Sequence, residues 1–141
     1  MLSLQVSDVW ETPPWGDVEG GSFLNCAASI DWEGSIWDFA GVCRTLELEL
    51  GSTVEKHGRA RVIDIDILCA EETVIETSQL IVPHPRMHLR RFVLQPLSEV
   101  WRGQIPGLDR TPKELLHSCT DQSLIIRFMT FAEDAFSGGE F

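Results

Sequence analysis

The stretch "RVIDIDIL", residues 61–68, decides how the centre of this chain is read. In a strand, successive side chains point to opposite faces, so the isoleucines at 63, 65 and 67 share one face. Asp64 and Asp66 then lie about 7 Å apart on the other face. Two neighbouring carboxylates repel each other and are costly to bury. The pattern therefore predicts a strand with one apolar face and one acidic face that needs water or a cation beside it.

Two interpretations of the acidic face stay open. Carboxylate oxygens suit Mg²⁺, which keeps some of its waters and shares its remaining positions with substrate phosphates. Alternatively, Asp64 and Asp66 form an ordinary solvated face, since an Asp-x-Asp pair alone is a weak signal.

The clearest predicted helix covers residues 35–50. Its apolar residues recur with a period near 3.6, Ser35 is the expected N-cap with Asp38 three positions on, and Gly51 is the expected stop. Glu47 falls only about 20° from Ile36 on the helical wheel, inside the apolar stripe. Glu47 either bends out to water or an arginine, or points its carboxylate towards a site.

Other segments follow from alternation and from turn residues. Residues 2–11 predict a half-buried strand and residues 22–31 a well-buried strand, separated by a stiff proline and glycine loop. Residues 71–85 predict a short hairpin-like or edge element, residues 86–100 a bend or helical turn before a short apolar segment, and residues 111–118 a helix with a capping box. The run "SLIIRFMTF" fits a strand or the tail of a helix, and "SGGEF" is expected to fray.

A basic cluster follows the acidic stretch in "VPHPRMHLRRFVLQPL". Arginine matches phosphate oxygens with paired donors, so this cluster next to a metal-binding strand would grip a triphosphate. Alternatively, its charges only balance an acidic surface. Zinc binding by His84 and His88 is disfavoured because Pro85 disturbs the helical spacing that the pair would need. The cluster comprises His84, Arg86, His88, Arg90 and Arg91.

The stretches "TPPWG" (residues 12–16) and "FLN" (residues 23–25) combine a stiff loop, an aromatic ring and an amide. These groups supply the stacking face, the donors and the acceptors that a flat nitrogen heterocycle requires. Read alone, the first stretch is equally well a turn.

Composition limits the class of protein. With 141 residues and 43% hydrophobic content, we expect one domain over residues 1–141. A net charge of −11 argues against a general binder of nucleic acid or of an anionic membrane. The four scattered cysteines favour free, buried thiols in a reducing cytosol. No apolar run reaches membrane-spanning length and no signal peptide is evident, so we expect a soluble, cytoplasmic protein.

Taken in order, the motifs resemble the 6-hydroxymethyl-7,8-dihydropterin pyrophosphokinase family of folate biosynthesis. The series runs from TPPWG and FLN through "LELELG" and R-x-x-D-x-D-I-L to PHPRM-x-x-R-x-FVL-x-PL, over residues 2–97. The resemblance implies a ferredoxin-like α/β (α+β) sandwich, an antiparallel sheet with helices. It also implies transfer of diphosphate from ATP to the pterin hydroxymethyl group with release of AMP, assisted by two Mg²⁺ ions.

The resemblance also implies roles for individual residues. Asp64 and Asp66 match the metal ligands and, with Arg61, the catalytic group. The ATP-binding positions are matched by Arg61, His84, Arg90 and Glu47. The pterin-binding positions are matched by Thr12, Pro13, Trp15, Phe23, Asn25 and Phe92, with the pterin stacked between the two phenylalanine rings.

The chain departs from the family pattern in two places. It begins after the strand, Gly-Ser-Asn turn and helix that open that pattern, so we expect strand 2–11 to lack a neighbour and to expose an edge that another chain could complement. In the loop "GSTVEKHGRAR", Ser52 replaces an arginine and the tryptophan is absent, leaving Lys56 or Arg59 as substitutes. The alternative to an active enzyme is therefore an impaired or non-enzymatic descendant that serves as a nucleotide-binding or scaffold subunit.

Overall fold

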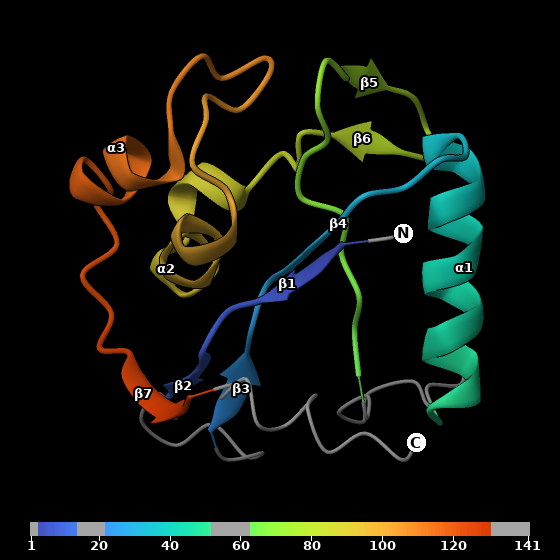
Figure 1. Cartoon of the computed structure of the whole chain (residues 1–141). Helices are drawn as coiled ribbons and strands as arrows, with labels where there is room; N and C mark the ends of the chain where they lie inside the picture. Colours follow the sequence, from blue (N-terminus) through green and yellow to red (C-terminus); the bar gives the residue numbers. More distant parts are fainter. Residues whose placement is uncertain (1–2, 14–21, 52–62, 131–141) are drawn as a thin grey trace.

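The computed structural model describes residues 3–13, 22–51 and 63–130. Figure 1 shows α1 standing apart from α2 and α3, with β1, β4 and the extended segment after residue 62 drawn between them. Antiparallel sheets and helices make this an α+β fold, consistent with the predicted ferredoxin-like sandwich. The strands are β1 (Leu4–Val6), β2 (Val9–Thr12), β3 (Phe23–Asn25), β4 (Ala28–Ile30), β5 (Ile75–Glu76), β6 (Ile81–Val82) and β7 (Ile126–Met129). The helices are α1 (Ile36–Glu49), the 3-10 helix η1 (Met87–Leu89), α2 (Arg91–Val100) and α3 (Pro112–His117).

The predicted strand 2–11 forms β1 and β2, separated at Ser7, where the alternation slips. β1 pairs with β4, and β2 lies between β3 and β7, all antiparallel. The expectation that this stretch lacks a neighbour and exposes an edge was wrong for β2, which has a strand on each side. Within the described ranges, β1 has a strand on one side only.

Residues 22–31 form β3 and β4 rather than one strand, and the expected deep burial was wrong. Phe23 is 57% exposed and Leu24 is 51% exposed, whereas Ala27, between the two strands, is buried. The break falls at Ala27, whose amide donates to Ser7 Oγ over 2.8 Å while its carbonyl accepts from the Ser7 amide. The side chains on either side of Ala27 lie on sheets of only two or three described strands, and the described helices cover these sheets only in part.

Helix α1 begins and ends where its sequence predicts. Ser35 Oγ accepts from the Asp38 amide over 3.1 Å, and Gly51 has the positive φ of a helix stop. Cys43 is its one buried residue, and one flank of the apolar stripe, Val42, Leu46 and Leu50, is exposed. Packing against the described residues therefore covers only part of the apolar stripe of α1.

The predicted strand 61–68 is extended but joins no ladder among the described residues, so its assignment as a sheet strand is wrong for residues 63–68. Its alternation is nevertheless confirmed, because the three isoleucines are partly buried while Asp64 and Asp66 are exposed. Periodicity reports which face is covered, whereas a ladder also requires a partner backbone alongside.

The main core lies around α2. Met87, Leu94 and Ile105 are fully buried, and Leu115 of α3 and Cys119 pack in the same cluster. The segment 86–100, expected as a turn before an apolar segment, is η1 followed by α2, with the buried Pro96 inside the helix. The capping box of α3 is confirmed, with Thr111 Oγ1 accepting from the Glu114 amide over 3.1 Å.

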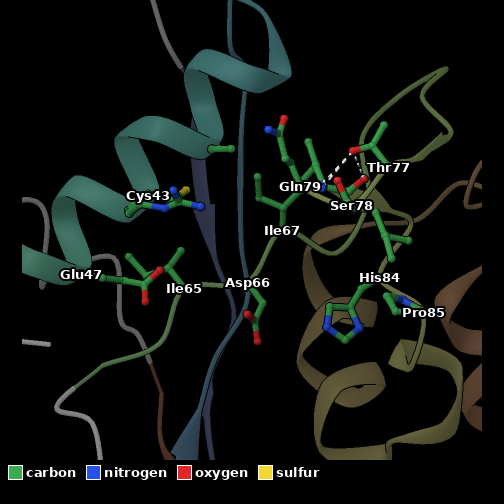
Figure 2. A pocket seen from close by; sticks show the side chains of 14 residues that line it. Cys43, Glu47, Ile65, Asp66, Ile67, Thr77, Ser78, Gln79, His84 and Pro85 are labelled. Carbon is green, nitrogen blue, oxygen red and sulfur yellow. Dashed lines mark hydrogen bonds between the residues drawn. The ribbon is translucent and has the colours of Figure 1, made fainter. Parts of the chain in front are cut away.

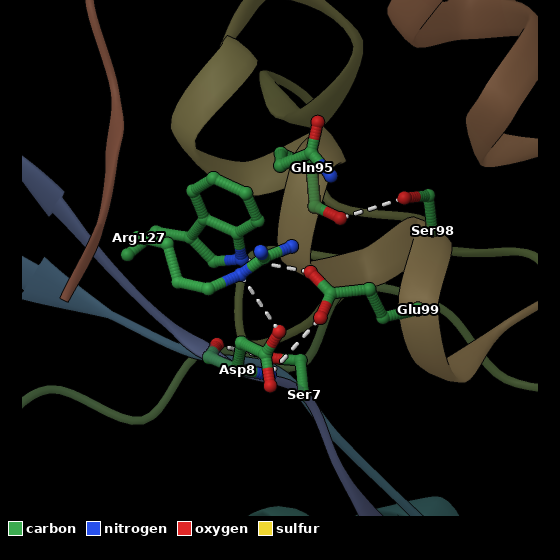
Figure 3. A network of polar contacts seen from close by, with 7 residues as sticks. Ser7, Asp8, Gln95, Ser98, Glu99 and Arg127 are labelled. Carbon is green, nitrogen blue, oxygen red and sulfur yellow. Dashed lines mark hydrogen bonds and ion pairs between the residues drawn. The ribbon is translucent and has the colours of Figure 1, made fainter. Parts of the chain in front are cut away.

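A polar network joins β2 and β7 to α2 (Figure 3). Glu99 accepts from the Asp8 amide over 3.0 Å and from Trp10 Nε1 over 2.7 Å. Arg127 pairs with Asp8 over 3.0 Å, and its guanidinium carbon lies 5.0 Å from the centre of the Trp10 ring. Glu99 thus fixes the face of β2 that is turned towards α2.

The remaining predictions divide by location. The hairpin within 71–85 is confirmed as β5 and β6, and "SLIIRFMTF" contributes β7. The four cysteines are free as expected, with Cys43 and Cys119 buried, but Cys26 is exposed. None of the helices in the described ranges is both long and apolar enough to cross a membrane. The loop at 14–21, the loop at 52–62 and the tail after 130 lie outside the described residues.

Candidate active site

A pocket of about 370 Å³ lies between α1, the extended segment and the β5–β6 hairpin. Glu47 of α1, Asp66 and His84 line it, and Figure 2 shows the Asp66 carboxylate between the other two side chains. These residues come from three separate stretches of sequence, and each was predicted to bind metal or ATP. Their convergence is the main geometric result.

Local structure explains each placement. The stripe position of Glu47 turns it towards the pocket, and the extended segment borders the pocket with three consecutive residues, Ile65, Asp66 and Ile67. The His84 amide donates to the Leu68 carbonyl over 2.7 Å, which ties the histidine to the end of the extended segment. The acidic and basic motifs are thus joined by one backbone hydrogen bond.

His84 is held in one orientation. Its Nδ1 accepts from the Arg86 amide over 3.2 Å, so a neutral ring carries its proton on Nε2. Burial lowers the pKa of His84, the Asp66 carboxylate opposes that shift, and Arg90 and Arg86 reinforce it. A neutral imidazole with a free Nε2–H donor is suited to hydrogen bonding with a phosphate oxygen.

The pocket also contains residues that the sequence motifs did not indicate. Cys43 and Arg44 lie on the pocket side of α1, and residues 77–81 form the opposite wall. Thr77 Oγ1 fixes that wall by donating to the Leu80 carbonyl and accepting from the Leu80 amide, each over 3.0 Å. A signal for Arg44 existed in the sequence, since it precedes Glu47 by three residues on one helix face.

The metal prediction can be tested against the donor set. Asp64 and Asp66 are exposed and offer hard oxygen ligands, which fit Mg²⁺. No three His, Cys, Asp or Glu side chains within the described ranges gather as a metal site, and His84 with His88 forms no such group. The two carboxylates thus fit Mg²⁺ by the chemistry of their donor atoms.

Three predicted pterin residues share one face of β2 and β3. Thr12 pairs with Phe23, and Asn25 lies two residues further along β3 on the face of Phe23. The Thr12 hydroxyl oxygen is buried and has no hydrogen-bond partner among the residues that the structure describes. α2 contacts both strands and carries Phe92 in its first turn. Pro13 is half-buried at the end of β2.

The predicted site residues are not all gathered in one place. Arg90 does not line the pocket, although its charge acts on His84 and its guanidinium carbon lies 5.7 Å from the centre of the Phe92 ring. Asp64 has an exposed side chain next to the pocket residue Ile65. Arg61 and Trp15, together with Ser52, Lys56 and Arg59, lie outside the described residues.

The fold and the pocket define an α+β protein with a cavity that is lined by two carboxylates, an arginine and an imidazole. The family model for 7,8-dihydro-6-hydroxymethylpterin-pyrophosphokinase matches residues 1–102. The chain belongs to this family, as the sequence motifs predicted.

Individual relatives agree with the family match. The chain is 39% identical over 118 residues to the 2-amino-4-hydroxy-6-hydroxymethyldihydropteridine pyrophosphokinase of Bacillus subtilis, covering 84% of this chain and 66% of that protein. It is 41% identical to the protein of the same name from Methylorubrum extorquens, covering 64% of this chain and 58% of the relative. A folic acid synthesis protein from Dictyostelium discoideum is 35% identical over 67% of this chain and 14% of its own length. The chain thus spans two thirds or less of these relatives.

Proposed function

We propose that this chain transfers diphosphate from ATP to 6-hydroxymethyl-7,8-dihydropterin and so forms the pterin diphosphate and AMP. The observation that carries the proposal is the convergence of Glu47, Asp66 and His84 on one pocket, in a chain of this family. A pocket of about 370 Å³ falls within the usual range for small-molecule sites.

The polyphosphate of ATP lies between the acidic and the basic side chains in this proposal. His84 Nε2 donates to a phosphate oxygen, and Arg90 and Arg61 offset phosphate charge. Glu47 lies on the opposite wall and contacts the nucleotide. Asp64 and Asp66 hold two Mg²⁺ ions jointly with the phosphates, and these ions supply charge neutralisation when bound.

The reaction is an in-line displacement at phosphorus. The hydroxymethyl oxygen of the pterin forms a bond to the β-phosphorus while the bond from that phosphorus to the α–β bridging oxygen breaks. AMP leaves with the bridging oxygen, and the hydroxyl proton passes to solvent. The protein contributes alignment and electrostatic stabilisation rather than covalent chemistry.

The pterin occupies the face of β2 and β3 that carries Thr12, Phe23 and Asn25. Asn25 both donates to and accepts from the heterocycle, and the buried Thr12 hydroxyl gains the partner that it otherwise lacks. The rings of Phe23 and Phe92 stack on the two faces of the pterin, with Pro13 and Trp15 beside it.

The test is incubation of the chain with ATP, Mg²⁺ and the hydroxymethyl pterin, followed by identification of the nucleotide product. AMP formation that is lost in Asp64→Ala and Asp66→Ala supports the transfer. Release of ADP, or no turnover by a folded chain, would sink it. ATP binding without AMP formation would instead indicate the non-enzymatic alternative, which no relative described above favours.

We further propose that residues 1–141 act as one domain in the cytoplasm. The core cluster joins Ala27 to α2 and α3, and free thiols are typical of a reducing compartment. Limited proteolysis tests the domain, because a single unit yields one protected fragment that contains both α1 and α3.

Among the described residues, β4 pairs with β1 on one side only, and this supports a proposal of strand complementation by another chain. The Ser7 amide donates to the Ala27 carbonyl and the Asp31 amide to the Ser3 carbonyl, and Ser29 lies opposite Gln5 midway between these two pairs. Hydrogen-bonded pairs alternate along an antiparallel ladder, so the amides of Ala28 and Ile30 point away from β1. We propose that a second copy pairs its β4 edge here about a two-fold axis. Light scattering should report a dimer for the wild type and a monomer for Ala28→Pro, and a monomeric wild type contradicts the pairing.

A further inference from the structure

Helix α2 starts without a cap of its own. Its N-cap residue, Arg90, makes no side-chain capping hydrogen bond, and the amides of Val93 and Leu94 donate to the Arg90 carbonyl. The amide of Arg91 is left to be satisfied from elsewhere.

Asp121 supplies that bond from a distant part of the chain. Its Oδ2 accepts from the Arg91 amide over 3.0 Å, across thirty residues of sequence. A carboxylate at a helix N-terminus also complements the helix dipole. Asp121 therefore acts as a tertiary cap for α2, and it lies beyond residues 1–102, which the family model matches.

The carboxylate of Asp121 is itself fixed. Its Oδ1 accepts from the Ser123 amide over 2.9 Å and from the Ser123 hydroxyl. The Arg91 guanidinium reaches the Ser123 carbonyl at 3.4 Å, and the Cys119 thiol lies 3.8 Å from the His88 carbonyl. Residues 119–123 thus hold the start of α2 in place through hydrogen bonds to Arg91 and to the His88 carbonyl.

The capped amide stands between two predicted substrate contacts. Arg90 precedes it and Phe92 follows it, with the Arg90 guanidinium carbon 5.7 Å from the centre of the Phe92 ring. A shift of the first turn would move both side chains together, one relative to the nucleotide and the other relative to the pterin. Displacements of about 1 Å at such a site are costly for catalysis.

We infer that Asp121 is a positioning residue that sets the first turn of α2, so that Arg90 and Phe92 are aligned with the two substrates. The inference rests on the proposed function. In this inference Asp121 contacts neither substrate and acts through Arg91, whose amide donates to its carboxylate.

The test compares Asp121→Ala with Thr111→Ala in the full chain. Both variants remove the acceptor of a helix cap, but Thr111 caps α3, which carries no predicted substrate residue. Asp121→Ala should raise KM for both ATP and the pterin about tenfold, whereas Thr111→Ala should leave both KM values near wild type. Asp121→Asn keeps an acceptor and should restore KM to within about threefold of wild type.

Each outcome has one meaning. If Asp121→Ala and Thr111→Ala both keep the wild-type KM values, the positioning role is overturned while the proposed function stands. If the wild type forms no AMP, the proposed function fails first and this inference falls with it. If Asp121→Ala does not fold, Ser123→Ala removes the hydroxyl bond to Oδ1 while the Ser123 amide keeps its own, and both KM values should rise by a smaller factor than in Asp121→Ala. Unchanged KM values in that variant overturn the inference.

Discussion

At the residue scale, Asp66 connects the proposed metal site to the proposed nucleotide site. It is a proposed Mg²⁺ ligand, and it lines the same pocket as the proposed ATP contacts Glu47 and His84. Asp66→Asn keeps the shape and removes the charge that a cation requires. A lost metal ligand at a phosphoryl-transfer site costs several kcal/mol, so kcat/KM should fall by about 100-fold or more. Steady-state AMP formation measures this.

The matched control for that substitution is Glu33→Gln, an exposed carboxylate in the loop before α1. It changes net charge by the same amount as Asp66→Asn, so it reports any effect of overall charge on ATP binding. Activity in Asp66→Asn within twofold of the control would contradict the assigned role.

Asp121 gives a pH-dependent prediction. Burial raises the pKa of its carboxyl. The hydrogen bonds from Ser123 and from the Arg91 amide, together with the Arg91 charge, lower that pKa by more, so the folded-state pKa lies below 3.8. The unfolded chain therefore binds this proton first as the pH falls. The ionised carboxylate contributes its full stability above the unfolded value and loses it as the pH falls through the lower folded value.

The measurement is urea unfolding of wild type and Asp121→Asn from neutral pH down to about pH 2. The wild type should be more stable above pH 3.8, and the difference should shrink below it. A difference that stays constant across this range would show that the carboxylate charge plays no part.

At the element scale, the sequence predicted the two capped helices, α1 and α3, better than α2 or the larger sheets, for a physical reason. Ser35 and Thr111 accept from amides three residues further on, and the Gly51 amide donates to the Leu48 carbonyl, so the signal is local. The extended segment around Ile65 and the exposed strand β3 depend on which backbone lies alongside, and no local pattern specifies that. The same holds for Asp121, whose partner is thirty residues away.

The capping box of α3 yields a second prediction at this scale. Thr111→Ala removes the acceptor for the Glu114 amide, and such a loss costs about 1 kcal/mol of unfolding free energy. Thr111→Ser keeps the hydroxyl and should retain most of the stability. Urea denaturation with an unchanged slope would measure both, and equal stability of the alanine and serine variants would contradict the cap.

At the scale of the whole molecule, the sequence predicted which residues form the site but not where in the fold they meet. Glu47, Asp66 and His84 converge on one pocket because the His84 amide bonds to Leu68 and because α1 turns its stripe inward. The motif order could name these residues through resemblance. The wall formed by residues 77–81 could not be named, since its side chains carry no pattern beyond a turn.

The same scale predicts unequal stability across the fold. α2 carries the fully buried Leu94 and packs against α3, whereas Cys43 is the one buried residue of α1. Few buried contacts allow local opening at low free energy, so amide hydrogen exchange should be fast in α1 and slow in α2.

Leu94→Ala should cost about 2–5 kcal/mol and accelerate exchange in α2 and α3 together. If a second copy pairs at the β4 edge, exchange at Ile30 should slow as protein concentration rises, while the amides of α2 stay unchanged. Equal protection of α1 and α2 in the dilute chain would show that contacts beyond those described here hold α1 in place.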